Sequence, residues 1–192
     1  MTHPAQKDEA YIVVDVEASG PNPGDYALLS IGACTVAEPR QTFYVELKPD
    51  RAAFTREAMA VNGLSLERLA AEGLLPEEAM QAFAGWVAQV VPGEAMPVFA
   101  AFNSPFDWMF VNDYFHRYLG RNPFGHSALD IKSMYMGLEG VSWQETSHRY
   151  VSQRYCGKPE LTHHALDDAI DEAEILQAMM GLRDTNCEEE GR

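Results

Sequence analysis

The chain has 192 residues, 46% of them hydrophobic, and a net charge of −15. This length and composition predict one globular domain, because a chain of this size can bury a core of its own. The acidic charge argues against a protein that coats long nucleic acid through bulk charge, but it permits a local basic patch or a substrate that is met through bound metal.

We find no targeting or membrane signal in the sequence. Residues 1–10 are polar and lack the apolar core of a signal peptide, and no apolar run approaches membrane-spanning length. Three scattered cysteines are too few for a disulfide framework or a zinc site, and they fit a reducing cytoplasm. We therefore expect a cytoplasmic protein with a single domain over residues 1–183 and with disorder at residues 1–10 and 184–192.

An apolar run at residues 11–14 leads directly into two carboxylates, Asp15 and Glu17, and then into Gly20. The run is typical of a buried strand, and the glycine with the proline after it predicts the exit turn. Because side chains alternate across a strand, the two carboxylates point to the same face and repel each other. A divalent cation removes this repulsion, and oxygen ligands suit Mg²⁺ or Mn²⁺. The alternative is a polar strand end that is exposed to water.

The middle of the sequence changes from strand patterns to helical periodicity. Sequential strands with short links suggest an antiparallel meander, and helices follow before one further apolar strand. Gly63 is expected to cap the C-terminal end of the first short helix, and Pro76 fits the first position of a long one. After the first strand, the expected elements are strands over residues 28–37 and 41–47, short helices over 55–62 and 65–70, a long helix over 76–91 and a strand over 98–102.

Asp107 lies near the start of a predicted helix that follows this last strand. Ser104 is expected to cap the helix, and Pro105 fits its first position. Asp107 shares a helix face with the large apolar side chains three, four and seven residues later. Two interpretations stay open. The spacing from Ser104 resembles a capping box, whereas a strand-to-helix junction is a common place for a site in an α/β sheet.

The stretch 117–159 has the opposite charge balance to the rest of the chain. It contains six basic and three acidic side chains, with aromatic residues between them. Such mixtures suit single-stranded nucleic acid, in which bases stack on aromatic rings and phosphates meet cations. The alternative is a solvated face above core aromatics. We expect a short edge strand over residues 128–131 and a helix over 142–153.

A third candidate site lies at the start of a helix that is predicted over residues 163–180. Asp168 lies beside apolar residues of this helix, which makes it the more buried acid and the better candidate for a metal ligand. The other acids are expected on the opposite, exposed face of the helix: Asp167, Asp171 and Glu174.

Together these motifs resemble the DEDDh group of 3′–5′ exonucleases, which includes oligoribonuclease, ribonuclease T and the proofreading subunits of replicative polymerases. The motifs, in chain order, are Asp15-x-Glu17, Asp107 within Asn-Ser-Pro-Phe-Asp, and His163-x-x-x-x-Asp168. The resemblance extends from about Tyr11 to Met180. It implies an α/β, ribonuclease H-like fold, with a central mixed five-stranded sheet and helices on both sides.

The resemblance implies a metal-dependent hydrolysis from the 3′ end of a nucleic acid. The residues that would hold two divalent cations, Mg²⁺ or Mn²⁺, are Asp15, Glu17, Asp107 and Asp168. His163 would take the proton from the attacking water as the general base. The substrate would be single-stranded or short RNA or DNA, and the product would be a nucleoside 5′-monophosphate. A homodimer is compatible with the family.

The resemblance also implies which residues meet the terminal nucleotide: Ala18, Ser19, Gly20, Asn62, Gly63, Asn103 and Phe106. Many relatives have threonine where this chain has Ala18 and a large apolar wedge where it has Pro21. Relatives often have another residue where this chain has His164, so His164 is treated as secondary to His163. Two other functions stay open: a module that binds nucleic acid or protein on the same fold without cleavage, and a phosphodiesterase for small nucleotides.

Overall fold

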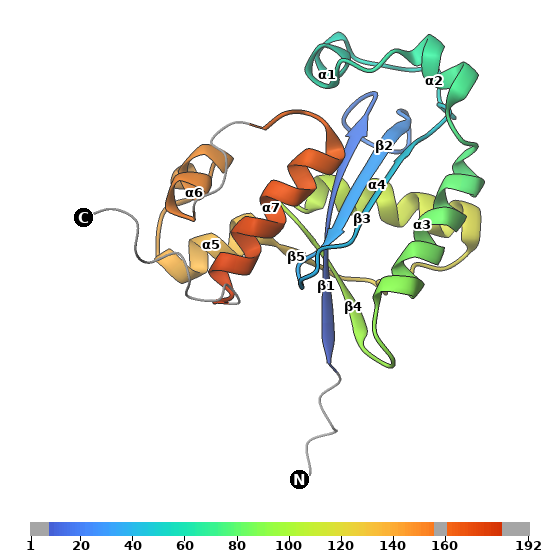
Figure 1. Cartoon of the computed structure of the whole chain (residues 1–192). Coiled ribbons are helices and arrows are strands. Elements are labelled where there is room, and N and C mark those ends of the chain that lie inside the picture. The colour runs from blue at the N-terminus through green and yellow to red at the C-terminus, as the bar shows by residue number, and fades with distance from the viewer. Residues whose placement is uncertain (1–7, 156–160, 182–192) are drawn as a thin grey trace.

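A mixed sheet of 5 strands forms the centre of the computed structural model, which describes residues 8–155 and 161–181. The strands are β1 (Glu9–Ala18), β2 (Leu28–Thr35), β3 (Thr42–Glu46), β4 (Met96–Ala101) and β5 (Ala128–Asp130). They lie in the order β3-β2-β1-β4-β5 (Figure 1). The first three pair antiparallel, whereas β4 is parallel to β1 and β5 is parallel to β4. The expected mixed sheet and its antiparallel meander are therefore confirmed.

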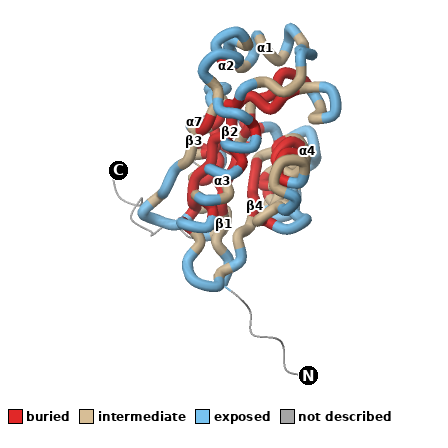
Figure 2. The backbone as a smooth tube through the Cα atoms, turned by 90° about the vertical axis from the view of Figure 1, so that its right-hand side faces the viewer, coloured by how far each residue is buried: buried red, intermediate tan, exposed pale blue. Residues whose placement is uncertain are grey.

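β1 occupies the middle of the sheet because its apolar run is buried on both faces. Ile12 and Val14 pack into a hydrophobic cluster on one face, and Val13 packs into a cluster on the other. Burial is concentrated along the strands and the helix sides that face them (Figure 2). Successive side chains of a strand alternate between its faces. Asp15 and Glu17 therefore lie on the face of the sheet that Val13 shares.

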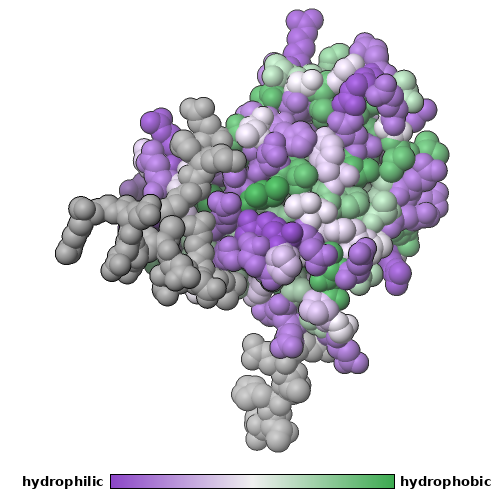
Figure 3. All heavy atoms as spheres, viewed as in Figure 1, coloured by the Kyte–Doolittle hydropathy of each residue, from purple (hydrophilic) through white to green (hydrophobic). Residues whose placement is uncertain are grey.

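The helices cover both faces of the sheet (Figure 1). The Ile12 face is covered by α3 (Pro76–Val90), α4 (Pro105–Tyr114) and a π-helical turn over Phe115–Leu119. The Val13 face is covered by α5 (Ile131–Glu139), α6 (His148–Arg154) and α7 (Ala165–Met179). Two short helices, α1 (Arg56–Asn62) and α2 (Leu66–Glu72), lie beyond the end of the sheet at which β1 finishes. On the face seen in Figure 3, hydrophilic residues are spread between smaller apolar areas.

The predicted helix over residues 142–153 is broken into two pieces. A 3-10 turn covers Trp143–Glu145, and α6 begins only at His148. The carboxylate of Glu145 accepts hydrogen bonds from the Ser142 amide at 3.0 Å and from the Ser142 hydroxyl at 2.7 Å. These bonds close a short turn, which competes locally with the continuous helix that residue periodicity favours.

Asp130 explains two further differences from the prediction. One carboxylate oxygen accepts a hydrogen bond from the Ser133 amide at 3.1 Å and so caps α5, a helix that the sequence prediction misses. The other oxygen accepts from the Ser104 amide at 3.0 Å. Ser104 itself has helical dihedral angles and no side-chain cap bond, so the predicted cap of α4 is wrong, whereas Pro105 does begin the helix.

Asp171 is buried, contrary to the expectation of an exposed face. Its exposed fraction is 3%, and that of its neighbour Glu172 is 2%, whereas Asp167 is exposed as predicted. α7 packs against β1 and β2 and also contacts α5, so only a narrow strip of the helix meets water. An apolar stripe predicts one buried face, but it does not reveal that a second layer covers another side.

The predicted disorder at both ends falls mostly outside the described residues. Glu9 and Ala10 fall within the predicted disorder, but they are ordered because they pair with β4 as the first residues of β1. Cys34 is a free, buried thiol, and the other two cysteines lie outside the described ranges. Within residues 8–155 and 161–181, no helix has the length and apolar character that crossing a membrane requires.

Candidate active site

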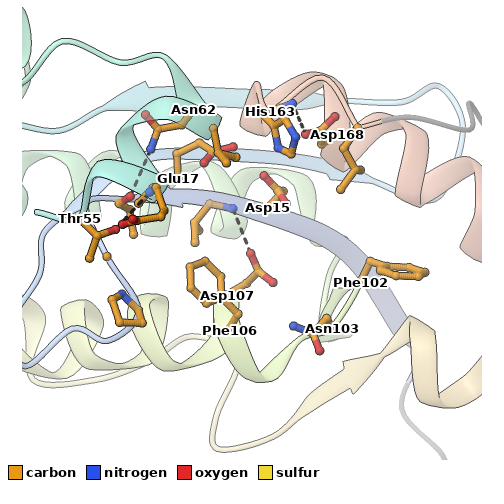
Figure 4. A pocket seen from close by; sticks show the side chains of 18 residues that line it. Asp15, Glu17, Thr55, Asn62, Phe102, Asn103, Phe106, Asp107, His163 and Asp168 are labelled. Atoms are coloured by element: carbon orange, nitrogen blue, oxygen red, sulfur yellow. Dashed lines mark hydrogen bonds between the residues drawn. The ribbon is translucent and has the colours of Figure 1, made fainter. Parts of the chain in front are cut away.

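An open cavity of about 500 Å³ lies where the end of β1 meets the turn after β4, helix α1 and the segment before α7 (Figure 4). Its lining includes all five residues of the sequence motifs: Asp15, Glu17, Asp107, His163 and Asp168. These residues belong to three segments that lie far apart along the chain. The fold therefore brings together the acids that the sequence analysis singled out.

Asp15 and Glu17 are half-buried at the end of β1. The register between β1 and β2 shifts between Glu17 and Ala18, so the regular pairing is interrupted beside the cavity. Burial raises the pKa of Asp15 well above its ordinary range, and neighbouring carboxylates, with Asp107 first among them, raise it further. Burial, and then the charge of Asp168, raises the pKa of Glu17 to about 8. Both acids are therefore poorly stabilised as anions in the protein alone.

Asp107 contacts β1 just beyond the point where its pairing with β4 ends. β4 pairs with β1 only as far as Val13, which lies opposite Ala100. The amide of Val16 has no strand partner on that side, and Asp107 Oδ1 accepts its hydrogen bond at 3.1 Å (Figure 4). Burial raises the pKa of Asp107, and the Val16 amide partly opposes this rise because it stabilises the charged form.

Gly32 lets α7 approach the sheet closely. Gly32 on β2 is the strand partner of Asp15 on β1, so this close approach lies directly beside Asp15. A Cβ at position 32 would lie 2.2 Å from the carbonyl carbon of Ala165 and from the amide nitrogen of Leu166. No side chain fits into so short a distance, so only glycine permits this contact. Asp168 lies in the first turn of α7, and the close approach brings it to the β1 acids.

Asp168 also organises the segment that carries His163. Its Oδ1 accepts hydrogen bonds from the Thr162 amide at 2.7 Å and hydroxyl at 2.9 Å, and its Oδ2 accepts from the His163 amide at 2.8 Å. His163 has a φ of +57°, a conformation that a non-glycine residue keeps only where its surroundings fix it. Its side chain is exposed, and ligand atoms of Glu17, His163 and Asp168 lie within 4.8 Å of one another.

Helix α1 forms another wall of the cavity. Its two ends are tied to the end of β1 by hydrogen bonds that start from Thr55 and Asn62. The Thr55 amide donates to the Ser19 carbonyl at 2.8 Å, and the Asn62 side-chain amide donates to the Ala18 carbonyl at 3.2 Å (Figure 4). Val61, which is 52% exposed, adds an apolar side chain to the lining.

Most residues that the resemblance assigns to the terminal nucleotide line the cavity: Ala18, Gly20, Asn62, Asn103 and Phe106. Ser19 and Gly63 are not in the lining. The Ser19 hydroxyl donates to the Ala53 carbonyl at 2.8 Å and accepts from the Ala27 amide at 2.9 Å, so this side chain links two loops. Gly63 ends α1 in the left-handed conformation with a φ of +65°.

Several residues of the site are not among those predicted from the sequence. The additional lining residues are Val16, Pro21, Thr55, Glu57, Ala58, Val61, Phe102 and Leu161. Glu172 was not predicted either; it is a buried acid whose pKa is raised by burial and then by Asp107. Glu172 lies four residues after Asp168, so helical spacing alone could have placed both acids on one face. In the described part of 117–159, no residue lines the cavity, and Lys132 instead lies over the Trp143 ring at 4.1 Å.

The donor set fits hard divalent cations. The oxygen ligands available are those of Asp15, Glu17, Asp107 and Asp168. Among the described residues that line the cavity, there is no lysine or arginine to neutralise them. A bound cation would stabilise the charged forms of these acids, and carboxylate oxygens are the ligands that Mg²⁺ and Mn²⁺ prefer.

Comparison with known proteins agrees with this arrangement. The model of the exonuclease family RNase_T matches residues 12–176. A relative from Escherichia coli, the 3′-5′ DNA exonuclease Cap18, is 48% identical over 171 residues, which cover 88% of this chain and 90% of that protein.

Two solved structures show the same fold. The nuclease domain of 3′hExo, a DEDDh family member bound to rAMP, has a TM-score of 0.73 at 17% identity, covering 93% of this chain and 94% of that one. Exonuclease I of E. coli in complex with a dT13 oligonucleotide has a TM-score of 0.69 at 16% identity, covering 90% of this chain and 41% of that one. The expected ribonuclease H-like fold is thereby confirmed. The chain belongs to the exonuclease family, as a DEDDh-type 3′–5′ exonuclease.

Proposed function

We propose that this enzyme removes nucleotides from the 3′ end of single-stranded DNA by a two-metal reaction that releases nucleoside 5′-monophosphates. The observation that carries the proposal is the convergence of acids from β1, α4 and α7 on one cavity, with no lysine or arginine in its described lining. The preference for DNA rests on the 48% identity to a protein named as a DNA exonuclease.

The proposed roles follow from the placement of each side chain. The residues that would hold the two cations, Mg²⁺ or Mn²⁺, are Asp15, Glu17, Asp107 and Asp168. When bound, such ions supply an activated water and neutralise charge on the scissile phosphate and the leaving 3′ oxygen. His163 lies exposed beside Glu17 and Asp168, where its imidazole can accept the proton of the attacking water.

The walls of the cavity fit a terminal nucleotide. Val61 and Phe106 offer apolar surface on which a base can pack, and Asn103 offers a polar side chain for the sugar. Because the positive charge of the bound metal ions would meet the phosphate, the chain does not need a basic channel at the site. This accounts for a net charge of −15 in a protein that acts on a polyanion.

Cleavage of end-labelled oligonucleotides tests the proposal. With Mg²⁺ or Mn²⁺, a 5′-labelled single-stranded DNA should give a ladder that shortens with time, whereas a 3′-labelled one should release labelled mononucleotide at once. EDTA should stop both reactions, and added metal should restore them. A matched RNA oligonucleotide tests the preference for DNA.

Three outcomes would contradict the proposal. Binding without cleavage would identify a non-catalytic module, and cleavage only of small nucleotide esters would identify a phosphodiesterase. Release of label first from the 5′ end would reverse the direction of the reaction.

The crowded acids also predict how the metal-free protein responds to pH. Glu17 has its pKa raised from an ordinary 4.5 to about 8, so between these values the folded state holds more protons than the unfolded state. Stability therefore falls as the pH rises through this window, and the stabilisation present at low pH is lost by about pH 8. Thermal unfolding in EDTA at pH 5, 6.5 and 8 should show a falling Tm. The fall should be smaller in the variant Glu17→Gln, and it should also be smaller in the wild-type protein when Mn²⁺ replaces EDTA. A Tm that rises over this range would contradict the account of repelling acids.

A further inference from the structure

Glu172 is a buried carboxylate that the proposed mechanism does not use. It lies one helical turn beyond Asp168 on α7, and its side chain is almost completely covered, with an exposed fraction of 2%. Its Oε2 accepts a hydrogen bond from the amide of Phe102 at 3.0 Å. This bond joins the helix that carries Asp168 to the turn that leads into the helix of Asp107.

That turn has a constrained backbone. β4 ends at Ala101, and Asn103 has a φ of +64°, which is unusual for a residue with a side chain. The two amides that flank Asn103 both donate to buried or half-buried carboxylates: Phe102 to Glu172 at 3.0 Å, and Ser104 to Asp130 at 3.0 Å. The turn is therefore held on each side of its strained residue by an acid from another element.

Asp107 follows immediately in the first turn of α4, so the position of the turn sets the position of its carboxylate. The Asn103 carbonyl accepts from the Phe106 amide at 3.1 Å, and the Ser104 carbonyl accepts from the Trp108 amide at 2.8 Å. These bonds make the turn and the start of α4 continuous. A shift of the turn would therefore move Asp107 relative to Asp15 and Asp168.

The surroundings of Glu172 are electrostatically unfavourable for a carboxylate. Burial, and then the charge of Asp107, disfavours its anion, and Asp168 is a further unfavourable neighbour. An apolar side chain of similar size would avoid that cost but could not accept the Phe102 amide. The hydrogen bond thus explains why an acceptor, and not an apolar side chain, occupies this position.

We propose that Glu172 is a positioning residue, which fixes the separation between Asp107 and Asp168 by joining α7 to the β4–α4 turn. This inference rests on the proposed function, because its purpose is to keep two metal-holding acids at a set distance. Hydrogen-bonded supports of metal ligands typically contribute roughly 10–100-fold to metal affinity or activity. Loss of Glu172 should change kcat and the metal concentration that the enzyme requires, and not KM, since Glu172 does not line the cavity that would receive the nucleotide.

Two substitutions at this position separate the hydrogen bond from the charge. Glu172→Leu removes the acceptor, and we expect kcat to fall and the Mn²⁺ concentration for half-maximal rate to rise, each by roughly 10-fold or more. KM for a single-stranded oligonucleotide should stay within about twofold, since the loss is in the placement of acids. Glu172→Gln keeps an oxygen that can accept the Phe102 amide, and it should retain kcat within about threefold. Asp167→Asn, which removes an exposed acid from the same helix, serves as the matched control.

Amide hydrogen exchange supplies a readout that does not depend on activity. The Phe102 amide should lose protection in Glu172→Leu and keep it in Glu172→Gln, while thermal unfolding shows whether each variant is folded. Wild-type kinetics in Glu172→Leu would overturn the proposal, and so would equal impairment of the leucine and glutamine variants, which would assign the role to charge. If the wild-type protein itself cleaves no oligonucleotide, the proposed function fails, and the exchange measurement still decides whether Glu172 holds the turn.

Discussion

Replacing Asp15 with asparagine is expected to abolish nucleotide release while it raises the thermal stability of the metal-free protein. Activity should fall by roughly 10³-fold or more, because metal ions supply several kcal/mol of transition-state stabilisation and about 1.4 kcal/mol corresponds to a factor of ten. The gain in stability has the same origin. Asp15 is disfavoured as an anion by burial and by the acids around it, and a neutral amide of the same shape removes that repulsion.

The measurement pairs initial rates on a 5′-labelled oligonucleotide with thermal unfolding in EDTA. Asp167→Asn is the matched control, because it removes one negative charge close to the site from an exposed position outside the cavity lining. The control should keep wild-type rates. Retained cleavage in Asp15→Asn would exclude metal-dependent chemistry at this cavity, and a lower Tm without metal would contradict the electrostatic account.

Replacing His163 with alanine is expected to lower kcat by roughly 10²–10⁴-fold, the usual contribution of a general base, without removing metal binding. The side chain is exposed, and the backbone amide of the residue, which donates a hydrogen bond to Asp168 at 2.8 Å, remains in the variant. Single-turnover rates and Mn²⁺ titration by calorimetry separate the two effects. Added imidazole should restore part of the lost rate, because the position that the ring leaves is open to solvent.

His164→Ala is the control for this experiment. The His164 ring stacks on Tyr44 at 4.7 Å, and its Nδ1 lies 3.3 Å from Asp167, so it faces away from the cavity lining. Its removal should leave kcat within about threefold, in line with the small effects of surface substitutions. An unchanged rate in His163→Ala at neutral pH would show that another group takes the proton.

Much of the fold could be predicted where neighbouring residues decide the structure. The apolar run at 11–14 gives β1, Gly63 caps the end of α1, and Pro76 begins α3, as their local patterns indicate. The acids of the site follow from the same kind of reasoning. Alternation along a strand pairs Asp15 with Glu17, and both line the cavity.

The remaining differences come from contacts between distant segments. α5 begins where it does because Asp130 caps it and also binds the turn before α4, and no local pattern shows that second partner. Asp171 is buried because α7 is covered on more than one side. Glu172 could have been placed beside Asp168 by its spacing, but its partner, the Phe102 amide, lies 70 positions away in the sequence.

Gly32 contributes no functional group, yet the seating of α7 above Asp15 depends on it, since even a methyl group would overlap the backbone of Ala165 and Leu166. Any other amino acid at this position would push the first turn of the helix outward and move Asp168 away from β1. Residue 32 is therefore restricted to glycine by the active site, although it lies on a strand and carries no polar side chain.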